Sequence, residues 1–80
     1  MSNPGSSERP DWPTAVVIGA GGLGMAVARR LGLCHRLIVA DRDGDHAERQ
    51  CAALRGEGHD AEAFACDVTV PDHILRLAEL

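Results

Sequence analysis

The sequence contains no lysine and no tyrosine, and all eight of its basic residues are arginines. Serine occurs only within residues 2–7, and the single asparagine is Asn3. The aromatic side chains are Trp12 and Phe64, so a core must be built from alanine, valine, leucine and isoleucine. A chain of 80 residues offers at most one small domain. The stability of such a domain should be marginal, because so short a chain buries little apolar surface to offset the entropy that it loses on folding.

Clustered positive charge is also missing, since 12 acidic residues outnumber 8 basic ones and the formal net charge is −4. Nucleic acids and anionic membranes both require a basic surface, so neither is an expected partner. No apolar run approaches the roughly 20 residues of a membrane span, and no signal-peptide pattern is present at the start. Cys34, Cys51 and Cys66 lie far apart, which favours reduced thiols and a cytoplasmic location. Cys34 and Cys51 stand among apolar residues and are expected to be small core side chains.

Metal-ligand spacing is absent as well. Asp41, Asp43 and Asp45 alternate, but an EF-hand loop would need glycine and glutamate where His46 and Ala52 stand. The four histidines show no zinc spacing and are expected to be solvated: His35, His46, His59 and His73. No metal is predicted.

A regular alternation of patterns follows a polar start. Residues 1–13, rich in proline and serine, predict a flexible leader, and residues 14–80 predict a partial dinucleotide-binding domain. Apolar runs predict strands at 14–18, 36–40 and 61–66, and helical patterns occupy 22–32, 45–55 and the stretch from 71 onward. This β-α-β-α-β-α order implies parallel strands with right-handed crossovers. The predicted fold class is α/β, a Rossmann-type half-fold with strand order 3-2-1.

Each predicted helix carries an apolar stripe that is expected to face the sheet. The stripes are Leu23, Ala26, Val27 and Leu31 in the first, Ala47, Cys51 and Leu54 in the second, and Ile74, Leu77 and Ala78 in the third. Thr69 with Asp72 three residues later predicts a capping box at the start of the last helix, with Pro71 in its first turn.

Glycines stand where the first helix should begin, in "VVIGAGGLG" at residues 16–24. Gly19, Gly21 and Gly24 satisfy the spacing G-x-G-x-x-G between a strand and a helix, which is typical of dinucleotide binding. The first glycine allows a sharp turn, the second a close approach of pyrophosphate, and the third tight packing of helix on strand. The helix N-terminus then presents free N–H groups to the phosphates.

An acidic residue ends the second predicted strand, as this kind of site requires. Asp41 lies 22 residues after Gly19 and can accept hydrogen bonds from the adenosine ribose hydroxyls. Its charge would repel a 2′-phosphate, which favours NAD over NADP. Arg42 could instead pair with that phosphate, or stack on adenine.

Three stretches together resemble the N-terminal part of the short-chain dehydrogenase/reductase family: "VVIGAGGLGMAVARRLG", "LIVADRD" and "FACDVTVPDHILRLAE". The resemblance covers about residues 14–80 and implies an NAD(P)-dependent oxidoreductase. In that family an Asp–Val pair after the third strand contacts adenine, which implies this role for Asp67 and Val68. The usual glycine motif of the family is T-G-x-x-x-G-x-G. Here Ile18 replaces the threonine and the loop is one residue shorter, so the motif is divergent.

The family's catalytic serine, tyrosine and lysine have no counterparts in this chain, so no catalytic residue is predicted. We expect the chain to be the cofactor-binding fragment of a longer enzyme and inactive alone. Alternatives are a stand-alone nucleotide-binding module, an ATP-binding adenylating enzyme, which shares "GAGGLG" and a following acid, and a flavin enzyme. The first strand would present an unpaired edge, which favours self-association there if the chain acts alone.

Overall fold

The computed structural model describes residues 11–79 and has three strands alternating with three helices. In chain order these are β1 (Thr14–Ile18), α1 (Gly22–Leu31), β2 (Arg36–Asp41), α2 (Gly44–Gly56), β3 (Ala61–Ala65) and α3 (Pro71–Ala78). The prediction of a Rossmann-like α/β fold is therefore confirmed. Most of the predicted leader, residues 1–10, lies outside the described residues, and the division of the chain at residue 13 stays a prediction.

The three strands form one parallel sheet in the order β1-β2-β3. Val17 lies opposite Val39, and Val39 lies opposite Ala63, which fixes the register across the sheet. The structure thus replaces the predicted order 3-2-1 by β1-β2-β3. Both orders place β2 in the middle, so the correction concerns the edge from which the strands are counted. The carboxyl ends of all three strands meet at one edge of the sheet.

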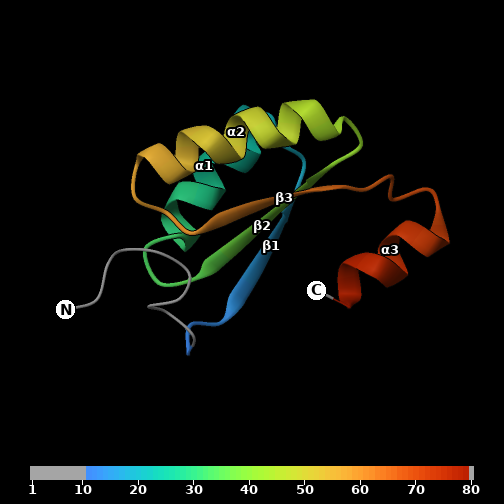
Figure 1. Ribbon diagram of the computed structural model, residues 1–80, viewed down its shortest axis with the longest axis horizontal. Coiled ribbons are helices and arrows are strands. Elements are labelled where there is room, and N and C mark those ends of the chain that lie inside the picture. The colour runs from blue at the N-terminus through green and yellow to red at the C-terminus, as the bar shows by residue number, and fades with distance from the viewer. Residues whose placement is uncertain (1–10, 80) are drawn as a thin grey trace.

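The two crossover helices cover the same face of the sheet. Figure 1 shows α1 and α2 together above the strands, and α3 on the other side of the sheet. α1 packs on β1 and β2, whereas α2 packs on β2 and β3. This arrangement follows from two right-handed crossovers in succession, which place both helices on one face.

The core lies between that face and the two helices. The predicted stripe of α2 is confirmed, since Ala47, Cys51 and Leu54 are all fully buried. The predicted stripe of α1 is confirmed only at Leu31, which packs against the core. It is wrong at Ala26, which is exposed, and at Leu23 and Val27, which are 82% and 43% exposed. The buried residues of α1 are instead Met25 and Ala28, so the helix is rotated relative to the predicted orientation.

The opposite face of the sheet is largely uncovered by the described residues. In β1, Val16 and Ile18 are 44% and 59% exposed, and Val17 is the buried residue. In contrast, the middle strand β2 buries four consecutive residues, 37–40. The third predicted stripe also lacks a partner here, because α3 has no buried residue among those described.

Two local predictions fail for identifiable reasons. The N-cap of α3 is Val70 and receives no side-chain cap. Thr69 instead donates its hydroxyl to Asp67 Oδ1 at 2.6 Å, so the predicted capping box does not form. Cys34 is exposed, because it follows the end of α1 in an outward-facing turn, whereas Cys51 and Cys66 are buried.

Candidate functional site

A hollow of about 300 Å³ opens at the carboxyl edge of the sheet. We call it the carboxyl-edge hollow. Its lining comes from the ends of all three strands and the loops that follow them: Ile18, Gly19, Asp41, Arg42, Cys66, Asp67, Val68 and Thr69. Five of the seven residues predicted to bind a cofactor are therefore brought together. Gly21 and Gly24 are not part of this lining.

The glycine loop turns at Gly19 and packs at Gly24. Gly19 has φ +100°, a conformation that L side chains rarely adopt, and its N–H donates to the carbonyl of Ala40 at 2.7 Å. A Cβ on Gly24 would collide with the backbone carbonyl oxygen of Gly19. This contact fixes the rotation of α1, and it explains why Met25 and not Leu23 faces the sheet.

Gly21 occupies a different environment. It is the N-cap of α1 in an extended conformation (φ −76°, ψ −175°) that any residue can adopt, and a Cβ there would meet nothing within 4 Å. The first turn of α1 has no acidic residue and no side-chain cap. The amide groups at this helix end are therefore available to an anion, with the positive end of the helix dipole behind them.

Asp41, at the end of β2, ties the glycine loop to the loop after β2. Its Oδ2 accepts the N–H of Ala20 at 2.8 Å, and its Oδ1 accepts the N–H of Asp43 at 2.9 Å. These two hydrogen bonds stabilise the ionised form and lower the pKa of Asp41 below its usual value of 3.8. The carboxylate is thus charged at neutral pH. Each oxygen still has a second lone pair for a ligand hydroxyl.

The opposite wall is a tight turn after β3. Asp67 Oδ1 accepts from both the N–H and the hydroxyl of Thr69, at 2.9 and 2.6 Å. The hydroxyl bond is the main reason why the pKa of Asp67 is lowered. The N–H of Asp67 donates to Nδ1 of His73 in α3 at 3.0 Å. Val68 is 49% exposed at the rim. Arg42 lines the same hollow and contributes positive charge near the carboxylates of Asp41 and Asp67.

Sequence reasoning missed four contributors to this edge. Ala20 acts through its backbone N–H, and Ile18, Cys66 and Thr69 line the hollow. Thr69 stands in the "CDVT" stretch and could have been found there, because a threonine two residues after an aspartate is a common turn pattern. The bond between Ala20 and Asp41 leaves no signal in the sequence. The two residues are 21 positions apart and meet only when β1 and β2 pair.

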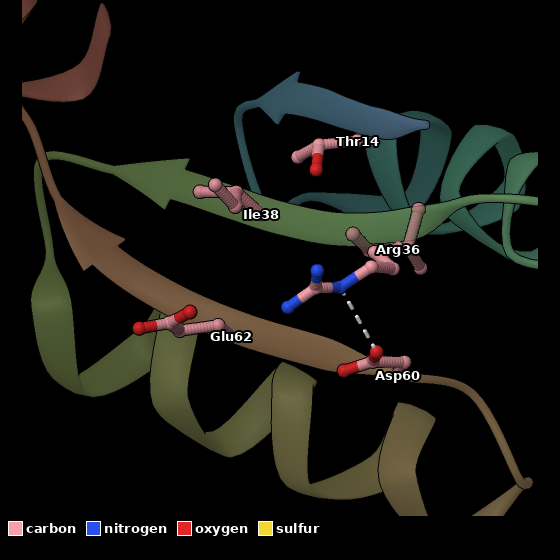
Figure 2. A pocket seen from close by; sticks show the side chains of 6 residues that line it. Thr14, Arg36, Ile38, Asp60 and Glu62 are labelled. Carbon is pink, nitrogen blue, oxygen red and sulfur yellow. Dashed lines mark ion pairs between the residues drawn. The ribbon is translucent and has the colours of Figure 1, made fainter. Parts of the chain in front are cut away.

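A second, smaller hollow of about 130 Å³ lies toward the other end of the strands and contains none of the predicted site residues. Figure 2 shows the Arg36 side chain between Asp60 and Glu62, with Arg36 extending from β2. Arg36 Nε lies 3.4 Å from Asp60 Oδ2, an ion pair in which that oxygen receives no hydrogen bond within residues 11–79. We interpret this contact as a structural ion pair between β2 and the start of β3.

Residues 11–79 include no group of three or more histidine, cysteine or acidic side chains that could hold a metal ion. No helix in that part of the chain is long and apolar enough to cross a membrane. The histidines are only partly exposed, and His46 lies close enough to Asp41 to lower its pKa slightly. The prediction that all four are solvated is thus only partly met.

No profile of a known protein family matches the chain. Individual relatives do match. The chain is 39% identical over 75 residues to a Streptomyces violaceoruber protein named as ketoacyl reductase 1 of granaticin polyketide synthase, covering 91% of this chain and 26% of the relative. It is 37% identical to the 1-deoxy-11-beta-hydroxypentalenate dehydrogenase of Streptomyces exfoliatus, covering 81% of this chain and 24% of that enzyme.

Solved structures agree with these matches. A metagenomic short-chain oxidoreductase in complex with NADP superposes with a TM-score of 0.77 at 35% identity, over 84% of this chain and 31% of that one. A short-chain dehydrogenase/reductase from Burkholderia phymatum in complex with NAD gives 0.77 at 30% identity, over 85% and 25%. The chain spans about a quarter of the length of the curated relatives it matches. In the part that it spans, the chain is similar in both sequence and fold to proteins named as short-chain dehydrogenases/reductases.

Proposed function

We propose that the chain supplies the adenine-side half of the nicotinamide dinucleotide site of an oxidoreductase. The observation that carries this proposal is the carboxyl-edge hollow, where a glycine loop and two strand-end carboxylates, Asp41 and Asp67, converge. Ligands of open parallel sheets bind outside the carboxyl ends of the strands, where the loops meet. The two structural neighbours described above were each solved with a nicotinamide dinucleotide.

Each predicted residue has a place in this proposal. Gly19 and Gly24 shape the loop, Gly21 leaves open space beside the amides of the α1 N-terminus, and the pyrophosphate would lie there. Asp41 would accept the ribose hydroxyls through the lone pairs that Ala20 and Asp43 leave free. Asp67 and Val68, at the rim of the opposite wall, would contact adenine.

The choice between NAD and NADP depends on Asp41 and Arg42. The lowered pKa keeps Asp41 ionised, and a carboxylate repels a 2′-phosphate, which favours NAD. Arg42 is exposed at the rim and is the cation available to a 2′-phosphate. Of the two structural neighbours, one was solved with NADP and the other with NAD. We propose NAD as the preferred ligand, with Arg42 allowing weaker binding of NADP.

The bound dinucleotide would supply hydride transfer, and the residues of this chain would bind and orient its adenosine half. The chain has no tyrosine or lysine, so it contributes no counterpart of the family's usual catalytic pair. We place this function in the cytoplasm. An ATP-binding adenylating function is the second candidate, because ATP presents the same adenosine and phosphates.

The proposal is tested by titrating the chain with NAD, NADP and ATP in a calorimeter, together with Asp41→Ala and Arg42→Ala. We expect NAD to bind more tightly than NADP. Asp41→Ala should weaken NAD more than NADP, and Arg42→Ala should do the reverse. The ratio of the two affinities is the quantity to compare, because loss of the bond between Asp41 and Ala20 disturbs the loop for both cofactors alike. Preferential binding of ATP would favour the adenylating alternative. An unchanged ratio in Asp41→Ala would refute the ribose assignment.

A further inference from the structure

The imidazole of His73 in α3 contacts Asp67, which lines the carboxyl-edge hollow. His73 Nδ1 accepts the N–H of Asp67 at 3.0 Å, six residues back along the chain. Packing contributes little to this junction, since α3 has no buried residue among those described and Ile74 and Leu75 are 46% and 63% exposed. The hydrogen bond therefore does more than packing to orient α3 relative to the turn.

Asp67 is held at three separate groups: its carboxylate, its carbonyl and its backbone N–H. Thr69 holds its carboxylate with two hydrogen bonds, but Thr69 belongs to the same turn and moves with it. Val70 N–H closes that turn on the Asp67 carbonyl at 2.9 Å. The His73 bond differs, because it holds the backbone N–H of Asp67 and its acceptor lies within the helix. It thus fixes the plane of the peptide that precedes Asp67.

We propose that His73 is a positioning residue for the adenine wall of the site: its Nδ1 lone pair holds the Asp67 peptide, and so sets the direction in which Asp67 and Val68 face the hollow. This inference rests on the proposed function, which assigns the adenine contact to those two residues. No direct contact between His73 and the ligand is required.

Only one protonation state of His73 can perform this role. An N–H can donate to Nδ1 only while that nitrogen is unprotonated, so the ring proton is on Nε2. An imidazolium carries a proton on both nitrogens and would place two N–H groups against each other. The Asp67 carboxylate, which its bonding partner His73 and Arg42 both influence, is the charged group of the residue that His73 contacts. α3 itself carries Asp72 in its first turn and Arg76 in its last turn. The Asp67 carboxylate could pair with an imidazolium, but only if the ring left the backbone N–H.

Two substitutions separate these effects in the full 80-residue chain. His73→Asn places an oxygen acceptor near the position of Nδ1 but cannot be protonated in this pH range, whereas His73→Leu removes the acceptor. At about pH 8, where histidine is ordinarily neutral, we expect His73→Leu to weaken NAD binding by about three- to tenfold. His73→Asn should remain within about twofold of the parent chain, because one hydrogen bond replaces another. The parent chain should lose affinity when the pH is lowered to about 5.5, and His73→Asn should lose less.

His35→Asn is the matched control, because His35 lies between α1 and β2, before the strand rather than at its carboxyl end, and bonds the Leu31 carbonyl. Its pH profile should match that of the parent. His46 lies near Asp41 and will leave some pH dependence in every variant. The decisive quantity is therefore the difference between the parent and His73→Asn profiles. Identical profiles would overturn the inference, even if His73→Leu failed to fold.

A second readout does not depend on the ligand. In the free chain, the amide proton resonance of Asp67 should shift between about pH 8 and about pH 5.5, and in His73→Asn this shift should be lost. If NAD binds the parent and all His73 variants alike, the positioning role is wrong while the proposed function stands. If the parent binds no dinucleotide, the proposed function fails and this inference fails with it, whatever the amide resonance does.

Discussion

Replacing Gly21 by alanine should separate folding from dinucleotide binding. Gly21 already has φ and ψ that alanine adopts, and the added Cβ meets no atom within 4 Å. Alanine lowers the entropy of the unfolded chain, a gain of ~0.4–1 kcal/mol, but is a poorer N-cap than glycine by an amount of similar size. The free energy of unfolding should therefore change by less than about 0.5 kcal/mol, the difference between those two effects.

Binding should respond differently, because the methyl group occupies the space proposed for the pyrophosphate. A displaced phosphate loses charge-assisted hydrogen bonds of ~1.5–3 kcal/mol each, so we expect NAD affinity to fall at least about tenfold. Gly24→Ala is the opposite case, since its Cβ would collide with the Gly19 carbonyl and should destabilise the fold by ~1–3 kcal/mol.

Gly56→Ala is the control, because it is equally open but lies at the end of α2. Its NAD affinity should equal that of the parent chain. The assays are a urea melt followed by circular dichroism and a calorimetric titration with NAD. Normal NAD binding by Gly21→Ala would refute the phosphate assignment, and a destabilisation as large as that of Gly24→Ala would refute the steric argument.

Three further predictions concern the fold. Leu54→Ala should lower the free energy of unfolding by ~2–5 kcal/mol, because the Leu54 side chain is fully buried. Leu75 is 63% exposed, so Leu75→Ala should change the free energy of unfolding by less than ~0.5 kcal/mol. Equal effects of the two substitutions in urea melts would contradict the packing. In the folded chain the pKa of Asp41 is lower than the usual value of 3.8, which applies in the unfolded chain. The ionised Asp41 carboxylate therefore stabilises the fold above pH 3.8, and this stabilisation is lost as the pH falls through the lower pKa of the folded chain. Acid melts between about pH 5 and pH 2 should therefore show a shallower loss of stability in Asp41→Ala than in the parent; parallel curves would refute the two backbone bonds. Alkylation of the native chain should modify the exposed Cys34 quickly and spare the buried Cys51 and Cys66. At Cys51, burial also raises the pKa of the thiol, which lowers its reactivity further. Equal alkylation rates at all three cysteines would contradict the burial.

Periodicity and turn chemistry were sufficient to predict the strands, their parallel arrangement and the place of Asp41. Valine, isoleucine and alanine runs between glycine-bearing turns have few alternatives in a βαβ unit. The rotation of α1 could not be predicted in this way. Leu23 and Val27 form a stripe as regular as that of Met25 and Ala28, and the contact between Gly24 and Gly19 decides between them.

The hydrogen bonds within the site could not be predicted from the sequence either. The bonds from Ala20 to Asp41 and from Asp67 to His73 join a backbone N–H to a side chain of another element. Such bonds depend on register and on loop geometry, which residue types do not specify. The positions of the glycines and acids were therefore predictable, whereas the hydrogen bonds that hold them in place required the structure.

The most direct test of the account is to map the amide resonances of the chain that shift on addition of NAD. The carboxyl-edge hollow predicts that the shifts concentrate in the glycine loop around Gly19 and Gly21, at Asp41 and Arg42, and in the turn at Asp67 and Val68. The amides of Arg36, Asp60 and Glu62 around the second hollow should remain unchanged. Shifts centred on that second hollow, or none at saturating NAD, would contradict the account.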